Sequence, residues 1–211
     1  MKSLFAWISK ALDVDLNVKS RLVLIMAVLI LLPTFIFPLW YMTFWSYQYP
    51  DGLRLDIYSY KLGGGDDGND ITEINILNHY IGMAALEEEN FLELKWIPLA
   101  LGIFLILTLR AIIFGKVGKI LDVLMMFTYF GAFSLWSFWY KLNAYGHDLD
   151  PHASVEIDPF TPPVFGFEQV GQFKVWSYPH ISSYMLGAFA ILLVLAMYLS
   201  LRKRTNQLEL K

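Results

Sequence analysis

Residues 22–45 read LVLIMAVLILLPTFIFPLWYMTFW, an apolar run without a single charged side chain. About 20 apolar residues suffice to cross the ~30 Å hydrocarbon layer of a bilayer as a helix. We therefore expect a first transmembrane helix at residues 21–46, with its second half kinked by Pro33 and Pro38. The run is far longer than the apolar part of a signal peptide, and no small-residue cleavage site follows it, so we expect it to be retained.

Three more segments of the chain meet the same criterion of length and apolarity. They are residues 97–114, 120–140 and 180–200, and a short turn at 115–119 joins the first two of them. The chain of 211 residues is 56% hydrophobic and only 17% charged, whereas soluble domains carry about 25% charged residues. The sequence thus predicts an all-α integral membrane protein with four transmembrane helices, whose first partner is the lipid bilayer.

Charged residues are distributed unequally between the two sides of this predicted topology. The side with both termini, including the tail at 201–211, and the 115–119 turn carries 11 basic and 4 acidic residues, a net charge of +7. The other side carries 5 basic and 15 acidic residues, a net charge of −10. Because cytoplasmic loops are enriched in Lys and Arg, we expect both termini in the cytoplasm and the acidic side outside it.

Several classes of function are disfavoured by what the sequence lacks. Without cysteine there are no disulfides, thiolate zinc sites, Cys-ligated iron–sulfur clusters or covalently attached c-type haem. The formal net charge of −3 argues against a nucleic-acid partner. No predicted span carries a central histidine or carboxylate, which argues against a haem held between helices and against proton-coupled transport. No local motif for a catalytic nucleophile or a phosphate-binding loop is present, so we expect no enzymatic activity.

The two long segments on the acidic side, residues 47–96 and 141–179, are expected to hold the function, because long loops in compact proteins are usually functional. LRLDIYSY at 53–60 alternates in hydrophobicity as a strand does, and FKVWSY at 173–178 is also strand-like. We expect these two stretches to form a small β-element above the membrane.

Helical elements are also expected outside the spans. Asp70 and Glu73 match a helix-capping pattern, which predicts a helix at about 71–92 that nearly joins the second span. Residues 1–20 contain a short amphipathic pattern, which predicts a helix on the cytoplasmic surface or a simple topology anchor. Six of the seven tryptophans are expected at the outer ends of spans, as an interfacial belt. They are Trp40, Trp45, Trp96, Trp136, Trp139 and Trp176.

The first candidate metal site lies in NHYIGM at 78–83. On the predicted helix His79, Met83 and Glu87 are spaced i, i+4 and i+8, so that one face offers an imidazole, a thioether and a carboxylate. An imidazole together with a thioether suits copper. The alternative is that Met83 packs in the interior and that His79 is an ordinary surface residue.

The second candidate lies in YGHDLDPH at 145–152. His147 and His152 are the expected nitrogen donors, with Asp150 as a possible carboxylate ligand beside them. The alternative is an exposed turn in which the aspartates cap backbone amides. Because the spans on either side of the 115–119 turn are antiparallel neighbours, we expect both candidates to converge on one site. Two independent surface clusters are the competing arrangement.

A further acidic stretch, GGGDDGND at 63–70, suggests calcium only weakly, because its spacing is not that of an EF-hand loop. Together with four spans, the motifs INILNHYIGM (74–83), YGHDLDPHA (145–153) and FTPPVFG (160–166) resemble a family of bacterial membrane proteins. That family is associated with gene clusters that build the copper enzyme nitrous oxide reductase. The resemblance implies copper handling at the outer face of the cytoplasmic (inner) membrane. Its matching positions are His79, Met83, His147 and His152.

Two functions from different classes follow from these patterns. The first is an accessory protein that delivers copper to, or matures, a periplasmic copper enzyme. The second is a non-catalytic subunit of a larger respiratory membrane complex, whose acidic, aromatic loops dock periplasmic partners. A third possibility, an oxidoreductase subunit with copper as its redox centre, is neither supported nor excluded by the sequence.

Overall fold

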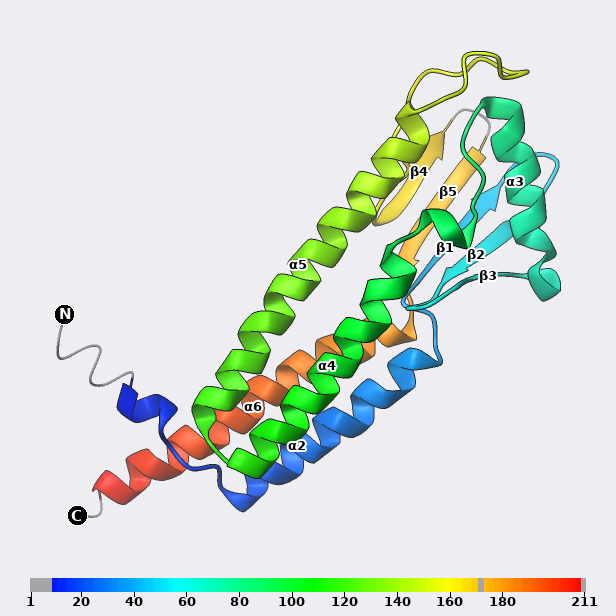
Figure 1. Cartoon of the computed structure of the whole chain (residues 1–211). Coiled ribbons are helices and arrows are strands. Elements are labelled where there is room, and N and C mark those ends of the chain that lie inside the picture. The colour runs from blue at the N-terminus through cyan, green and yellow to red at the C-terminus, as the bar shows by residue number, and fades with distance from the viewer. Residues whose placement is uncertain (1–8, 171–172, 210–211) are drawn as a thin grey trace. The chain divides into compact units, whose positions relative to one another are not determined.

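The computed structural model describes residues 9–170 and 173–209 (Figure 1). These residues form two compact units. The first unit comprises the chain up to Pro33, Leu99–Gly131 and the chain from Tyr184 onward, and the second comprises Thr34–Pro98 and Ala132–Ser183. Of the amphipathic helix predicted within residues 1–20, residues 9–12 are helical, and residues 1–8 lie outside the described residues.

Among the residues that the structure describes, four helices are long and apolar enough to cross a membrane, so the chain is a multi-pass membrane protein, as predicted. They are α2 (Val18–Leu31), which continues as the short 3₁₀ helix η1 (Leu32–Phe35), α4 (Glu93–Phe114), α5 (Val117–His147) and α6 (Ile181–Glu209). Helix α5 is longer than the predicted span at 120–140, and its last turn contains the Tyr145–His147 motif that we had expected in a loop.

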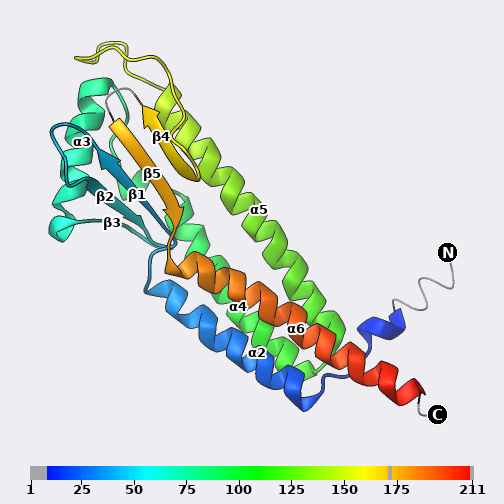
Figure 2. The same ribbon diagram turned by 180° about the vertical axis from the view of Figure 1, so that it is seen from behind.

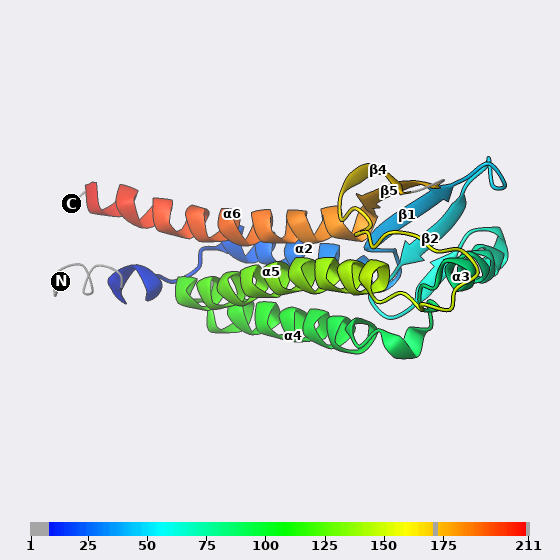
Figure 3. The same ribbon diagram turned by 90° about the horizontal axis from the view of Figure 1, so that it is seen from above.

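In the first unit, α2 and α6 lie side by side and are joined by buried polar groups (Figure 3). The hydroxyl of Ser20 donates to the carbonyl of Ala196 at 2.7 Å, and the hydroxyl of Ser200 donates to the Ser20 oxygen at 2.7 Å. Asn17 caps α2 by accepting from the Ser20 amide, and its own amide donates to the carbonyl of Leu199. Each of these polar groups therefore has a partner, which an apolar surrounding requires.

The turn between α4 and α5 consists of Gly115 and Lys116. Gly115 has a φ of +66°, which favours glycine, and its carbonyl accepts from the amide of Leu16 at 2.7 Å. Lys116 forms an ion pair with Asp15 at 3.0 Å. The tight turn predicted at 115–119 is therefore present, and the segment that precedes α2 is bonded to it.

The second unit contains a five-stranded antiparallel sheet, so the predicted all-α class is wrong in this part of the chain (Figure 2). The strand order is β3-β2-β1-β5-β4. The strands are β1 (Trp40–Trp45), β2 (Leu53–Ile57), β3 (Leu62–Gly64), β4 (Gly166–Val170) and β5 (Phe173–Pro179). The two expected strands exist as β2 and β5, but β1 lies between them and pairs with both.

Strand β1 is the main difference from the predicted first span at 21–46. Pro33 and Pro38 each lack the N–H that a helix needs, and the helical segment ends at Phe35. Beyond them the aromatic and β-branched residues WYMTFW favour a strand. Met42 is 2% exposed on one face of β1, while its neighbours point to the other face. Three tryptophans of the expected interfacial belt, Trp40, Trp45 and Trp176, therefore lie in strands.

One face of the sheet carries the hydrophobic core of the second unit. Met42, Leu55 and Val175 are buried on this face and belong to the same apolar cluster as Ile74 of helix α3 (Asn69–Ile81). Figure 3 shows α3 lying on one side of the sheet. The partly buried residues packed against this cluster include Leu86, Phe91, Phe138 and Leu142, which come from the segment before α4 and from α5.

Helix α3 is shorter than the helix predicted at 71–92. It ends at Ile81 because Gly82 adopts a left-handed conformation with a φ of +77°. Its start also differs from the predicted capping box, since Gly68 occupies the N-cap position. The Asp70 carboxylate instead accepts a hydrogen bond from the backbone amide of Arg54 at 2.8 Å, so it ties the helix to strand β2.

Candidate metal-binding loops

The two histidine-bearing segments of the second unit are joined by hydrogen bonds. The amide of Asp150 donates to the carbonyl of Gly82 at 2.8 Å, and the amide of Val155 donates to the carbonyl of Tyr80 at 3.0 Å. The Tyr145 hydroxyl donates to the carbonyl of Ala85 at 3.2 Å. The loop that follows α5 is thus fixed along the end of α3, which brings the segments of the two sequence motifs together.

Gly82 makes this close approach possible. A β-carbon at position 82 would lie 2.8 Å from the carbonyl oxygen of Asp150 and 3.0 Å from the β-carbon of Ala153. Any larger residue would have to displace the backbone of the second segment. The glycine therefore serves both the left-handed end of α3 and the contact between the loops.

His147 is the last residue of α5, and its side chain is anchored by one ring nitrogen. Nδ1 lies 3.0 Å from the carbonyl oxygen of Asn143, one turn earlier in the helix. A carbonyl only accepts, so Nδ1 carries a proton, and in the neutral ring Nε2 then has the lone pair that a metal would need. Asn143 is itself held by a hydrogen bond from its amide to the hydroxyl of Thr161 at 2.9 Å.

His152 is anchored in the same way by Asp150. One carboxylate oxygen of Asp150 accepts from the backbone amide of His152 at 2.8 Å and lies 3.2 Å from its Nδ1. The hydrogen bonds that Asp150 accepts from the backbone amide and from the ring of His152 hold the pKa of Asp150 below its ordinary value of 3.8. The side chain of His152 is 91% exposed, so its Nε2 is accessible from solvent.

The three residues of the first motif do not share a helix face, because the helix ends before the second of them. His79 is exposed in the last turn of α3. Met83 follows the glycine that ends the helix, and its amide donates to the carbonyl of Asn78 at 2.8 Å. Glu87 precedes a short 3₁₀ helix, η3 (Glu88–Asn90). The expected i, i+4, i+8 arrangement is therefore wrong as geometry.

Within residues 9–170 and 173–209, no three His, Asp or Glu side chains are placed so that together they could hold one metal ion. A site for one metal ion in these loops would therefore combine at most two His, Asp or Glu side chains with the thioether of Met83 or with ligands from outside the chain. The fourth histidine lies elsewhere: Nε2 of His180 is 3.4 Å from the Arg54 guanidinium, and its ring meets Tyr41 edge-on.

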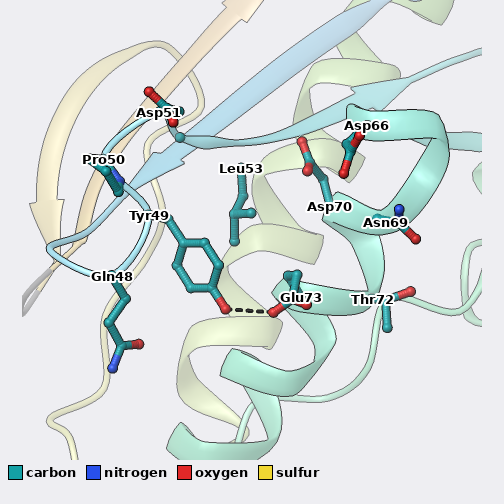
Figure 4. Close-up of a pocket in the computed structure, with 11 residues that line it drawn as sticks. Gln48, Tyr49, Pro50, Asp51, Leu53, Asp66, Asn69, Asp70, Thr72 and Glu73 are labelled. Carbon is teal, nitrogen blue, oxygen red and sulfur yellow. Dashed lines mark hydrogen bonds between the residues drawn. The ribbon is translucent and has the colours of Figure 1, made fainter.

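A separate acidic hollow of about 640 Å³ lies between the β1–β2 turn and the start of α3 (Figure 4). The Tyr49 hydroxyl donates to the Glu73 carboxylate at 2.6 Å across it, and this hydrogen bond raises the pKa of Tyr49 above 10.0. Asp66, Asn69 and Asp70 of the acidic stretch line the hollow. The hydrogen bond between Tyr49 and Glu73 was not predicted from the sequence. The acidic lining residues of the hollow are Asp51, Asp66, Asp70 and Glu73.

Sequence reasoning located the histidines but missed the groups that orient them. Asn143 and Thr161 carry no pattern that links them to His147, since one lies inside a helix and the other in a proline-rich connector. The spacing of Asp150 and His152 does suggest a local turn, which is the alternative that we considered. Comparisons with protein-family models, curated proteins and solved structures give no match to this chain.

Proposed function

We propose that this protein is a membrane accessory protein that handles copper at the outer face of the cytoplasmic membrane. In this proposal both termini are cytoplasmic and the second unit faces the periplasm. The protein delivers copper to a periplasmic copper enzyme or helps to mature it, and it catalyses no reaction itself. The resemblance of its motifs to proteins associated with nitrous oxide reductase maturation supports this choice of target.

The observation that carries the proposal is the way in which two histidines are anchored. In both His147 and His152, Nδ1 is bonded to a protein oxygen, so in the neutral ring it is Nε2 that offers its lone pair to a metal. Histidines that bind metals almost always donate the other ring N–H to a carbonyl or carboxylate in this way. The hydrogen bond fixes the tautomer and the ring orientation before any metal arrives.

The first segment supplies the softer ligand. Met83 lies next to Gly82, whose carbonyl is bonded to Asp150. Two imidazoles, those of His147 and His152, and the thioether of Met83 form a donor set that suits Cu(I). Asp150 then acts as a positioning residue for His152.

A titration of Cu(I) in competition with a coloured Cu(I) chelator tests this proposal on the full chain in lipid nanodiscs. We expect binding that weakens by at least about tenfold in His152→Ala and Met83→Leu, because each removes a ligand. Glu156→Gln, an exposed change in the same loop, is the matched control and should bind as the unmodified protein does. Equal affinity in all four proteins, or no binding in any, would contradict the proposal.

The charge of the second unit favours one alternative function, a docking subunit of a respiratory complex. This unit holds 15 acidic and 5 basic residues, a net charge of −10. Such a field attracts basic partners in a salt-dependent manner. Stable co-purification with subunits that contain haem or copper, together with an absence of copper in the isolated chain, would favour this alternative.

A further inference from the structure

The sheet face opposite the hydrophobic core is covered with aromatic rings. Strand alternation and the register of β1, β5 and β4 place them in adjacent rows, and each ring contacts the next. Ring centroids are 5.6 Å apart for Trp45 and Trp176, 6.2 Å for Phe167 and Trp176, and 4.9 Å for Phe165 and Tyr178. We call this surface the aromatic face. Its residues are Tyr41, Trp45, Phe165, Phe167, Trp176 and Tyr178.

The aromatic face remains open to its surroundings, unlike the core face. Trp176 is 43% exposed, Phe167 52% and Phe165 65%. By comparison Val175, the neighbour of Trp176 on the core side, is 3% exposed. A contiguous apolar surface of this kind marks a contact with a protein or with a membrane.

The connections of the chain favour the membrane. Strand β5 ends at Pro179, and only His180 separates it from Ile181, the first residue of the membrane helix α6. Strand β1 begins at Trp40, four residues after η1. The amide of His180 donates to the carbonyl of Leu39 at 2.8 Å, which holds both connections together. Strands β1 and β5 therefore each have one end within a few residues of a membrane helix.

The chemistry of the face also matches a bilayer surface. Tryptophan and tyrosine are the residues that concentrate at the level of lipid headgroups. Arg54 lies 5.7 Å over the Tyr41 ring, and Lys174 pairs in register with Trp45. Arg54 forms an ion pair with Asp56, and the additional charge of Lys174 makes this group of three residues net positive. The rest of the unit is strongly acidic and would be repelled by anionic lipids.

We propose that the aromatic face contacts the headgroup layer of the bilayer into which α6 inserts, with Arg54 and Lys174 directed at lipid phosphates. The occupant of the face is thus lipid rather than a second copy or another protein. This contact is independent of copper binding, because the histidine segments lie at the end of α3, on the other side of the sheet. Lipid contact would fix the orientation of the second unit above the membrane.

The absence of cysteine allows a direct test, since a single introduced cysteine can be labelled without background. Phe167→Cys places a fluorescent nitrobenzoxadiazole label on the aromatic face. Glu168→Cys is the matched control, because the adjacent residue of the same strand is exposed and points to the opposite side. The full-length proteins are placed in nanodiscs of phosphatidylcholine and phosphatidylglycerol that contain lipids with a nitroxide on the headgroup.

We expect the nitroxide lipids to quench the label at position 167 several-fold more than the label at 168, and aqueous iodide to show the reverse order. Adding Arg54→Gln and Lys174→Gln should reduce the quenching at 167. Equal quenching at both positions by iodide, with none by lipid, would overturn the proposal. Protection at 167 from both quenchers in native membranes, but not in nanodiscs, would also overturn it by showing that a protein covers the face.

Discussion

Gly82 is the residue through which the two histidine segments meet, and its replacement tests that contact. Gly82→Ala puts a β-carbon against the backbone of Asp150 and strains a φ of +77°. Gly68→Ala is the control, because Gly68 has a φ of +98° with nothing within 4 Å of the added carbon. Strain alone costs on the order of 1–3 kcal/mol in either variant. We expect Gly82→Ala to lower the thermal unfolding temperature further than Gly68→Ala and to weaken copper binding as well.

The Gly68 control decides how the result is interpreted. If both alanine variants lose the same stability and both bind copper normally, the contact between Gly82 and Asp150 has no role in holding the site. A loss confined to Gly82→Ala shows that the clash with the second segment, rather than the left-handed backbone, is responsible.

Tyr49 provides a pH-dependent test at the acidic hollow. Its hydrogen bond to Glu73 raises the pKa of the phenol above 10.0. The contribution of this hydrogen bond to the stability of the folded state is therefore complete below pH 10 and is lost as the pH rises through the folded-state pKa. The phenolate absorbance of the protein minus that of Tyr49→Phe should therefore show a midpoint above pH 10. In a Glu73→Gln background the midpoint should move down, and a midpoint at or below pH 10 in the unmodified protein would contradict the assignment.

Strand β1 is the element whose identity matters most for the second unit. Thr43 lies at the centre of the middle strand and pairs with Arg54 on one side and Trp176 on the other. Proline at this position removes a ladder hydrogen bond and leaves its carbonyl partner unpaired, so we expect Thr43→Pro to cost about 1–3 kcal/mol and to unfold the second unit. Thr43→Val keeps the strand and should retain the fold. Protease resistance of the purified chain distinguishes the outcomes.

This variant separates a strand from a membrane helix at the same position. A transmembrane helix that extended to residue 46 would tolerate a third proline near its end, since neighbouring groups satisfy the freed carbonyl. Unchanged protease resistance in Thr43→Pro would therefore support the helix expected from sequence and contradict the sheet.

The elements show where the sequence was sufficient and where it was not. The helices at 97–114, 120–140 and 180–200 followed from apolar length, which is a strong signal because lipid demands an internally bonded backbone. The end of the first span did not follow, because a continuous apolar run does not distinguish a helix from a buried strand at WYMTFW. The helix predicted at 71–92 was too long, because the sequence NHYIGM does not by itself show that the helix ends at Gly82.

The candidate site was also predicted only in part from the sequence. The sequence predicted both His147 and His152 in one loop, whereas the structure places His147 at the end of α5 and His152 in the loop that follows it. The hydrogen bonds from Asn143 to Thr161 and from Asp150 to Gly82 depend on tertiary contacts that no local pattern contains. The face shared by His79, Met83 and Glu87 was inferred from helical periodicity and failed with the helix.

At the scale of the whole molecule, the distribution of charge predicts the orientation. Cytoplasmic reporters fused after Lys211 and after Gly118 should be active, because both positions lie on the side with a net charge of +7. A reporter fused after Gly64, in strand β3 of the acidic unit, should be inactive. Cytoplasmic activity at Gly64 would reverse the orientation and place the histidine segments inside the cell.

The proposed function requires a single copper site built from both histidine segments. The copper content of the full-length protein tests this requirement most directly. Elemental analysis of the protein in nanodiscs after copper loading and removal of unbound metal should find about one copper per chain. Met83→Leu and His147→Ala should each contain none, because each removes a ligand from the same site, one from each segment. Half of the copper remaining in each variant would show two separate sites, and none in the unmodified protein would contradict the account.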